Sequence, residues 1–349
     1  MKRIFVLILM LCMVSMTFAC NSSQSIDKKV PQYGIQTEEA FKQWKNNTSE
    51  TVEHEEPENV YEIEQQSDFA KEVNSLGTEI VSYINATYGM KWAYDDVVIK
   101  TYDFSGTDFE FYNAYYSTTD YVLYLNSNYK FESSGLDYII AHELIHYIRH
   151  LNVGTADFLY EDTNGLGNYM MEALTDLLTI EMYGNTDKVD TFFMNNSSYC
   201  YQVVSMKVLK LAIPKLMYYY LENDMKSLEN EFNLLSSKYV DFEENDVENP
   251  FINYLDVLDA CYGSYRAMYN AYTYNDVLYT NKYAEIHNRY IIGQYELSVM
   301  LLTEADKNTK KQALSYIENL YRLESESVGD YSDEFYSGYL KYLNSCMEM

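Results

Sequence analysis

The segment LDYIIAHELIHYIRH, residues 136–150, restricts the possible folds of this chain more than any other stretch. It is mostly apolar, which is typical of a helix buried in a protein core. Yet it contains His142, Glu143, His146 and His150, and the histidines among them are three of only five in the chain. Polar groups are costly to bury without a partner. The fold must therefore supply hydrogen-bonding groups or a metal ion for these side chains.

The spacing within this segment favours a metal ion. His142 and His146 are four residues apart, so on a helix they project from one face, one turn above the other. Their ring nitrogens could then reach one ion at the roughly 2.0–2.1 Å that zinc requires. Glu143 lies about 100° further around the helix. It can approach a metal-bound water without being a ligand, which is the arrangement of a general base in an H-E-x-x-H motif. The sequence predicts one Zn²⁺ ion here.

A third protein ligand is expected from a second helix. His150 lies eight residues after His142, roughly 12 Å along a helix axis, so we expect it to be a helix C-terminal or surface residue. The segment GNYMMEALTDLLTIEMY, residues 167–183, has helical spacing and places Glu172 and Asp176 on one face. Glu172 is the predicted third ligand, and Asp176 would accept the free ring N–H of a histidine ligand. By itself, this pair could also be a solvated face of an amphipathic helix.

Strand-like runs precede the histidine segment. They are rich in β-branched and aromatic residues and are separated by the turn-like SGTD and STTD. A helical spacing comes before them, from Val60 to about Tyr88. We predict an α+β catalytic domain at 61–190, with a small antiparallel sheet beside the site helices. The three predicted strands lie within 96–104, 109–116 and 120–127.

The rest of the chain has a different composition and residue spacing. Glycine and proline become scarce beyond residue 200, and long stretches carry helical spacing. We predict a mostly α-helical C-terminal domain at 191–349 that completes the cleft, with Pro214 and Pro250 at kinks or helix boundaries.

The motif H-E-x-x-H followed by E-x-x-x-D resembles the gluzincin metallopeptidases. The resemblance covers residues 96–183, roughly a quarter of the chain. It implies a zincin-like catalytic core that hydrolyses peptide bonds. NAYYSTTDYVLY ahead of the histidine segment is similar to the thermolysin-type arrangement. That similarity implies that Asn113 and Ala114 lie on an edge strand that pairs with the substrate backbone. An ordinary edge strand remains the alternative for these two residues.

The same resemblance implies a group that stabilises the oxyanion formed during hydrolysis. HNRYIIGQYELSVMLL, residues 287–302, is similar to the Y-x-x-G element of the aminopeptidase-like gluzincins, which points to Tyr290. His287 and Tyr160 remain alternatives. The chain contains no G-x-M-E-N strand, so the resemblance does not extend to free-N-terminus specificity.

The N-terminus has the order of an export signal. Lys2 and Arg3 precede an apolar run at 4–16, which is too short for an ordinary membrane span. Cys20 directly after a small residue resembles a bacterial lipoprotein signal. We therefore expect a signal peptide at 1–19 and lipidation of Cys20 outside the cell membrane. Ordinary secretion with an unmodified Cys20 is the alternative.

Charge and cysteine content limit the partners. The formal charge is −28, and loss of the leader would take it to about −30. Such an acidic protein is a poor partner for nucleic acid or anionic membrane surfaces. Membrane contact is therefore expected only through Cys20, followed by a flexible acidic tether at 20–60. The cysteines beyond Cys20 allow at most one internal disulfide, and we expect buried or incidental thiols: Cys200, Cys261 and Cys346.

Together these features predict a lipid-anchored zinc metallopeptidase that acts on a peptide or protein substrate. The alternative is a non-catalytic envelope lipoprotein that binds a protein or peptide partner and has a structural or vestigial zinc. Glu143 argues against the alternative, because a structural zinc is closed by four protein ligands and needs no general base.

Overall fold

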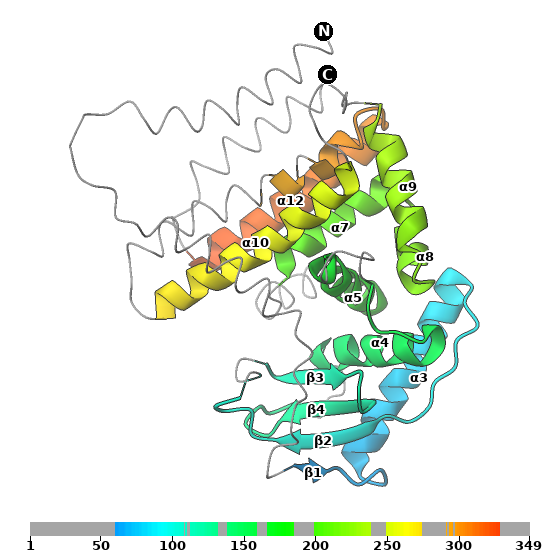
Figure 1. Ribbon diagram of the computed structural model, residues 1–349, viewed down its shortest axis with the longest axis vertical. Helices are drawn as coiled ribbons and strands as arrows, with labels where there is room; N and C mark the ends of the chain where they lie inside the picture. Colours follow the sequence, from blue (N-terminus) through cyan, green and yellow to red (C-terminus); the bar gives the residue numbers. More distant parts are fainter. Residues whose placement is uncertain are drawn as a thin grey trace, which may run out of the picture.

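The protein has an α+β fold in which a small four-stranded sheet is combined with many helices (Figure 1). None of the helices in the described part of the chain combines the length and apolarity that a membrane crossing needs. The expected leader and almost all of the tether lie outside that part. The computed structural model describes residues 60–107, 109, 112–131, 138–158, 166–184, 199–238, 249–273, 291, 293–295 and 297–328.

The sheet is mixed, which corrects the antiparallel sheet predicted from the sequence. Its strands are β1 (Tyr61–Glu62), β2 (Val98–Tyr102), β3 (Ala114–Ser117) and β4 (Val122–Asn126), in the order β1-β2-β4-β3. β2 and β4 run parallel, whereas the other two pairings are antiparallel.

The burial of β4 explains this order. Its residues Val122 to Leu125 are all buried, so the strand is covered on both faces and belongs in the middle of the sheet. β3 reaches one side of β4 through a tight turn, and the reversal of direction at that turn leaves β4 parallel to β2.

The helix α3 (Asp68–Tyr88), the first in the described residues, is shorter than predicted at its N-terminus. The hydroxyl of Ser67 accepts a hydrogen bond from the backbone N–H of Ala70 at 3.2 Å, which caps the helix at this point. Gly89 ends it in the left-handed conformation, with φ 71°. The predicted helical spacing is confirmed by an apolar stripe of buried residues at Val73, Leu76, Ile80 and Ile84.

The two predicted site helices are confirmed as α4 (Tyr138–Val153) and α5 (Asn168–Tyr183). Gly167 and Gly184 flank α5, and each has a φ of 97°, a left-handed conformation that glycine adopts without strain. α4 contacts β3 on one side and α5 on the other, so it lies between the sheet and the remaining helices (Figure 1).

The described residues beyond 199 are mostly helical, as predicted. Pro214 lies between two helices, and Pro250 is the first residue of another. The helices are α7 (Cys200–Ala212), α8 (Leu216–Leu221), α9 (Met225–Ser236), α10 (Pro250–Thr273) and α12 (Lys307–Val328).

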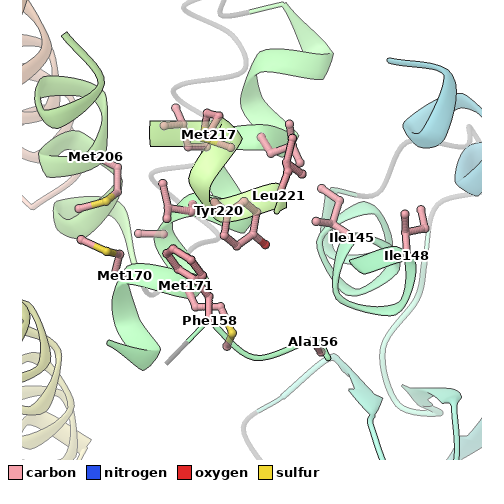
Figure 2. Packing of buried hydrophobic residues seen from close by; sticks show 14 of the residues in the cluster. Ile145, Ile148, Ala156, Phe158, Met170, Met171, Met206, Met217, Tyr220 and Leu221 are labelled. Carbon is pink, nitrogen blue, oxygen red and sulfur yellow. The ribbon is translucent and has the colours of Figure 1, made fainter. Parts of the chain in front are cut away.

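One main core joins the sheet to helices from both halves of the chain. Figure 2 shows Ile145 of α4, Met171 of α5, and Met217 and Tyr220 of α8 in this cluster. Residues on both sides of the expected boundary at 190 therefore bury their apolar surface together. A second cluster between α7, α10 and α12 contains the buried Cys200 and Cys261. Cys346 lies outside the described residues.

Gly77 of α3 is a position where the fold needs the smallest residue. It is buried, and the ring of Tyr94 packs where a β-carbon would lie. That ring is held in place because its hydroxyl donates to Oδ1 of Asn74 at 2.6 Å.

We expect Gly77→Ala to lower the free energy of unfolding by about 1–2 kcal/mol, because the added methyl displaces Tyr94 from this bond. Chemical denaturation measures the change. Gly293→Ala is the matched control, since the added carbon would lie 3.4 Å from Cγ1 of Val257, an ordinary contact. Equal stability of the two variants would contradict the assignment of a steric role to Gly77.

Candidate metal centre

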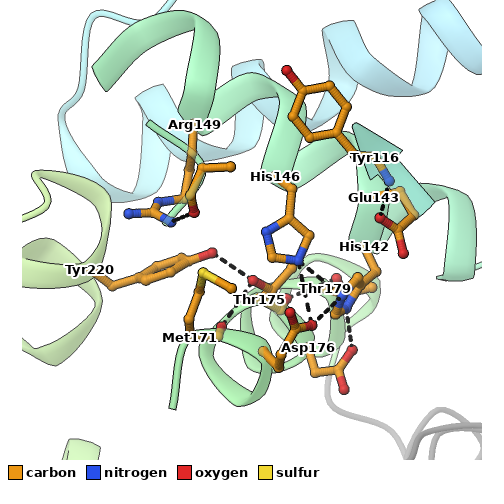
Figure 3. Close-up of polar contacts among 12 residues, drawn as sticks. Tyr116, His142, Glu143, His146, Arg149, Met171, Thr175, Asp176, Thr179 and Tyr220 are labelled. Atoms are coloured by element: carbon orange, nitrogen blue, oxygen red, sulfur yellow. Dashed lines mark hydrogen bonds and ion pairs between the residues drawn. The ribbon is translucent and has the colours of Figure 1, made fainter. Parts of the chain in front are cut away.

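α4 and α5 bring the three predicted ligands together (Figure 3). Nε2 of His142 lies 3.1 Å from Nε2 of His146 and 3.0 Å from Oε2 of Glu172. Nε2 of His146 lies 3.5 Å from the same oxygen. Both histidines are buried and Glu172 is half-buried. The three atoms therefore form a small triangle between the two helices.

The size and chemistry of this triangle fit a metal ion. Tetrahedral ligands at about 2.0–2.1 Å from zinc are about 3.4 Å from one another. The observed separations of 3.0, 3.1 and 3.5 Å are close to that value. A carboxylate oxygen and two unprotonated ring nitrogens are all acceptors, so a cation must balance them. His142, His146 and Glu172 could therefore hold a metal ion.

Asp176 lies behind His142, as predicted. Its Oδ1 is 2.6 Å from Nδ1 of the imidazole, and the carboxylate is almost completely buried. A carboxylate at this distance places the ring proton on Nδ1. The lone pair of Nε2 then points towards the other two ligands. Asp176 thus fixes both the tautomer and the orientation of His142.

The charges of the group are strongly coupled. Burial alone lowers the pKa of His142, but Asp176 and Glu172 outweigh it and raise that pKa well above its usual value. Burial favours neutral Glu172, yet His146 and His142 hold its pKa well below the usual range. Metal binding is therefore expected to compete with protonation of this group.

Glu143 lies beside the triangle but belongs to a different contact. Its Oε2 accepts a hydrogen bond from the backbone N–H of Tyr116 in β3 at 2.8 Å (Figure 3). Burial raises the pKa of Glu143, and the nearby His142 and His146 partly offset that rise. The structure thus places this carboxylate next to the three candidate ligands, where it is hydrogen-bonded to the edge of the sheet.

The predicted substrate-binding pair lies at that same edge. The backbone N–H of Asn126 donates to the carbonyl of Asn113 at 2.8 Å, so Asn113 is bonded to β4. Residues alternate in an antiparallel pair, and the register pairs Ala114 with Leu125. The backbone groups of Ala114 and Tyr116 therefore point away from β4. β3 is the terminal strand of the sheet in the part of the chain that the structure describes.

Two residues near the site were not predicted to be there. The ring of Tyr199, at the start of α7, is nearly parallel to that of His142, with centroids 6.3 Å apart. His150 is in the last turn of α4, as expected, but it is half-buried and its Nδ1 lies 2.8 Å from the hydroxyl of Tyr116. The helical spacing of Glu143 and His150, which puts them on one face, was the signal available in the sequence. The oxyanion candidates Tyr290, His287 and Tyr160 lie outside the described residues.

Comparison of the chain with protein-family models, curated proteins and solved structures found no match. The chemical assignment therefore depends on the geometry of the site. Three convergent ligands and an adjacent carboxylate could bind a metal ion and accept a proton beside it.

Asp176→Asn should weaken metal binding about 10–100-fold, because outer partners of ligating histidines typically contribute that much. Titration with Zn²⁺ or Co²⁺ against a chromogenic chelator measures the affinity. Glu181→Gln is the control, since Glu181 is a carboxylate of the same helix that bonds Lys210 and Tyr88 instead of the site. If the parent protein and Asp176→Asn bound the metal with equal affinity, Asp176 would have no role in metal binding.

Proposed function

We propose that this protein is a zinc-dependent metallopeptidase of the gluzincin type, with a zincin-like core. The observation that carries the proposal is the position of Glu143. It lies beside a group of two histidines, one helical turn apart, and a glutamate from a second helix. Two imidazoles and one carboxylate are the ligand set of a catalytic zinc with one open position, and this mixture of N and O donors suits zinc.

Zinc in this site would polarise the peptide carbonyl and lower the pKa of a water molecule. Glu143 uses Oε2 to accept from Tyr116, which leaves Oε1 to take a proton from water and pass it to the leaving amine. Asp176 keeps the proton of His142 on Nδ1. Tyr290 is our choice for the oxyanion donor, with His287 and Tyr160 as alternatives.

The substrate would be an extended peptide or protein segment. Ala114 directs its backbone N–H and C=O away from β4, on the edge where Tyr116 meets Glu143. An extended chain that pairs with this edge would lie across the metal centre, with Asn113 flanking it. This β-augmentation requires no particular side chain of the substrate.

The site of action would be outside the bacterial cell membrane. Lys2, Arg3 and the apolar run to residue 16 support export, and Cys20 supports a lipid anchor or, without lipidation, secretion. The strongly acidic composition supports a peptide or protein substrate rather than nucleic acid.

Glu143→Gln should keep the metal but lower kcat for casein or a peptide library about 10²–10⁴-fold, because it removes the general base. His146→Ala should lose both the metal and hydrolysis. Metal content by mass spectrometry and cleavage by chromatography measure the two effects. Glu181→Gln, away from the centre, should retain both. If Glu143→Gln cleaved peptides at the rate of the parent protein, Glu143 could not be the general base.

The same assay addresses the non-catalytic alternative. A chelator should abolish cleavage by the parent protein, and added Zn²⁺ should restore it. A zinc-loaded parent that cleaves none of the peptides in a broad library would favour a lipoprotein that binds a partner without hydrolysing it.

Pairing of a substrate with the edge of β3 predicts which backbone amides of the substrate contribute to its binding. Peptides N-methylated at one amide at a time should show a raised KM, about tenfold, at alternate positions only, because successive residues of a strand face opposite sides. The control peptides carry substituted side chains but unmodified backbone amides. A uniform effect at every position would contradict pairing with Ala114.

A further inference from the structure

One face of α4 is directed at a single residue of the sheet. Glu143, Tyr147 and His150 follow the i, i+4, i+7 spacing of a helical face. All three contact Tyr116 of β3: its backbone N–H, its ring and its hydroxyl, respectively. Tyr116 therefore joins the expected general base to the last turn of the helix.

The contacts hold both ends of Tyr116. Its backbone N–H donates to Oε2 of Glu143 at 2.8 Å, and its hydroxyl lies 2.8 Å from Nδ1 of His150. Its ring meets that of Tyr147 edge to face, with centroids 5.6 Å apart. Burial raises the pKa of the Tyr116 phenol, which therefore keeps its proton at neutral pH.

His150 is itself held on its other side. The ring of Tyr121 stacks on it, with centroids 4.4 Å apart and planes 20° apart. Tyr121 lies in the turn between β3 and β4 and has a φ of 58°, a left-handed conformation that is costly for a tyrosine. A residue held in this conformation on the imidazole indicates that the orientation of His150 is specified by the fold.

We propose that Tyr116 and His150 are positioning residues that, through β3, fix Glu143 relative to the candidate metal centre. The inference rests on the proposed function, since it treats Glu143 as the general base. Neither residue touches the reacting atoms. His150 acts on the phenol of Tyr116, which holds the strand, and the strand holds Glu143 through its backbone N–H.

The arrangement has a physical reason. Glu143 is next to the candidate ligands His142 and His146, and a cation held by them would attract its carboxylate towards the ligand group. The bond from Tyr116 to Oε2 opposes that movement. Proton transfer depends steeply on geometry, so a small shift of the base lowers kcat more than it changes substrate affinity.

The first test is kinetic. Tyr116→Phe removes the hydroxyl but keeps the ring and the backbone N–H, and we expect about a tenfold fall in kcat with KM within about twofold. His150→Leu should have a similar effect, and the double variant should be no worse than either single one. His150→Asn, whose amide can still bond the phenol, should recover part of kcat. Metal content should equal that of the parent in all of them.

The second test does not depend on activity. In His150→Leu the Tyr116 amide should exchange its hydrogen about tenfold faster by NMR, while the amides of α3 keep their rates. Tyr219→Phe is the control, because it removes a comparable phenol bond, 2.6 Å to Oε2 of Glu231, at α8.

The outcomes separate the two proposals. Unchanged exchange of the Tyr116 amide overturns the positioning role whether or not the parent cleaves peptides. Faster exchange with an unchanged kcat in an active protein also overturns it, since the base is then not controlled by the strand. If the parent cleaves no peptide, the proposed function fails, and the exchange rate still decides whether His150 holds the strand.

Discussion

The burial of polar side chains between α4 and α5 is the constraint on which the site depends. His142, His146 and Asp176 are buried and Glu172 is half-buried, so each would be costly if it stood alone. They are tolerated because they contact one another, at separations of 2.6 to 3.5 Å. The requirement that these groups meet fixes the rotation of each helix about its own axis. The same arrangement allows the side chains of the two helices to hold a cation.

Three faces of α4 make different contacts. One face carries the two histidines towards α5, and a second carries Glu143 and His150 towards β3. Apolar residues such as Ile145 and Ile148 fill the main core (Figure 2). The fully buried Arg149 lies near the end of the helix, with its guanidinium 4.1 Å from the ring centroid of Tyr220 and hydrogen-bonded to backbone carbonyls. α4, which carries both candidate histidine ligands, is thus packed against β3, α5 and α3, which favours a rigid site.

The sequence was sufficient for local features and insufficient for contacts between strands and helices. The helices α4 and α5, and the meeting of their histidines and carboxylates, follow from spacings of three and four residues that any helix imposes. The bond from Tyr116 to Glu143 could not be predicted, because it depends on the register between β3 and α4. His150 was set aside as a ligand by its distance along the helix, and the same distance places it beside the hydroxyl of Tyr116.

The incorrect prediction about the sheet concerns the feature that matters most for the site. In an antiparallel sheet that followed the chain order, β3 would lie between β2 and β4, and its backbone groups would be paired on both sides. In the observed order the buried β4 takes the central position and β3 becomes the edge. Only an edge strand can give the N–H of Tyr116 to Glu143 and leave the backbone groups of Ala114 directed away from the sheet. The apolar residues of β4, none of which belongs to the candidate site, therefore determine that β3 lies at the edge beside that site.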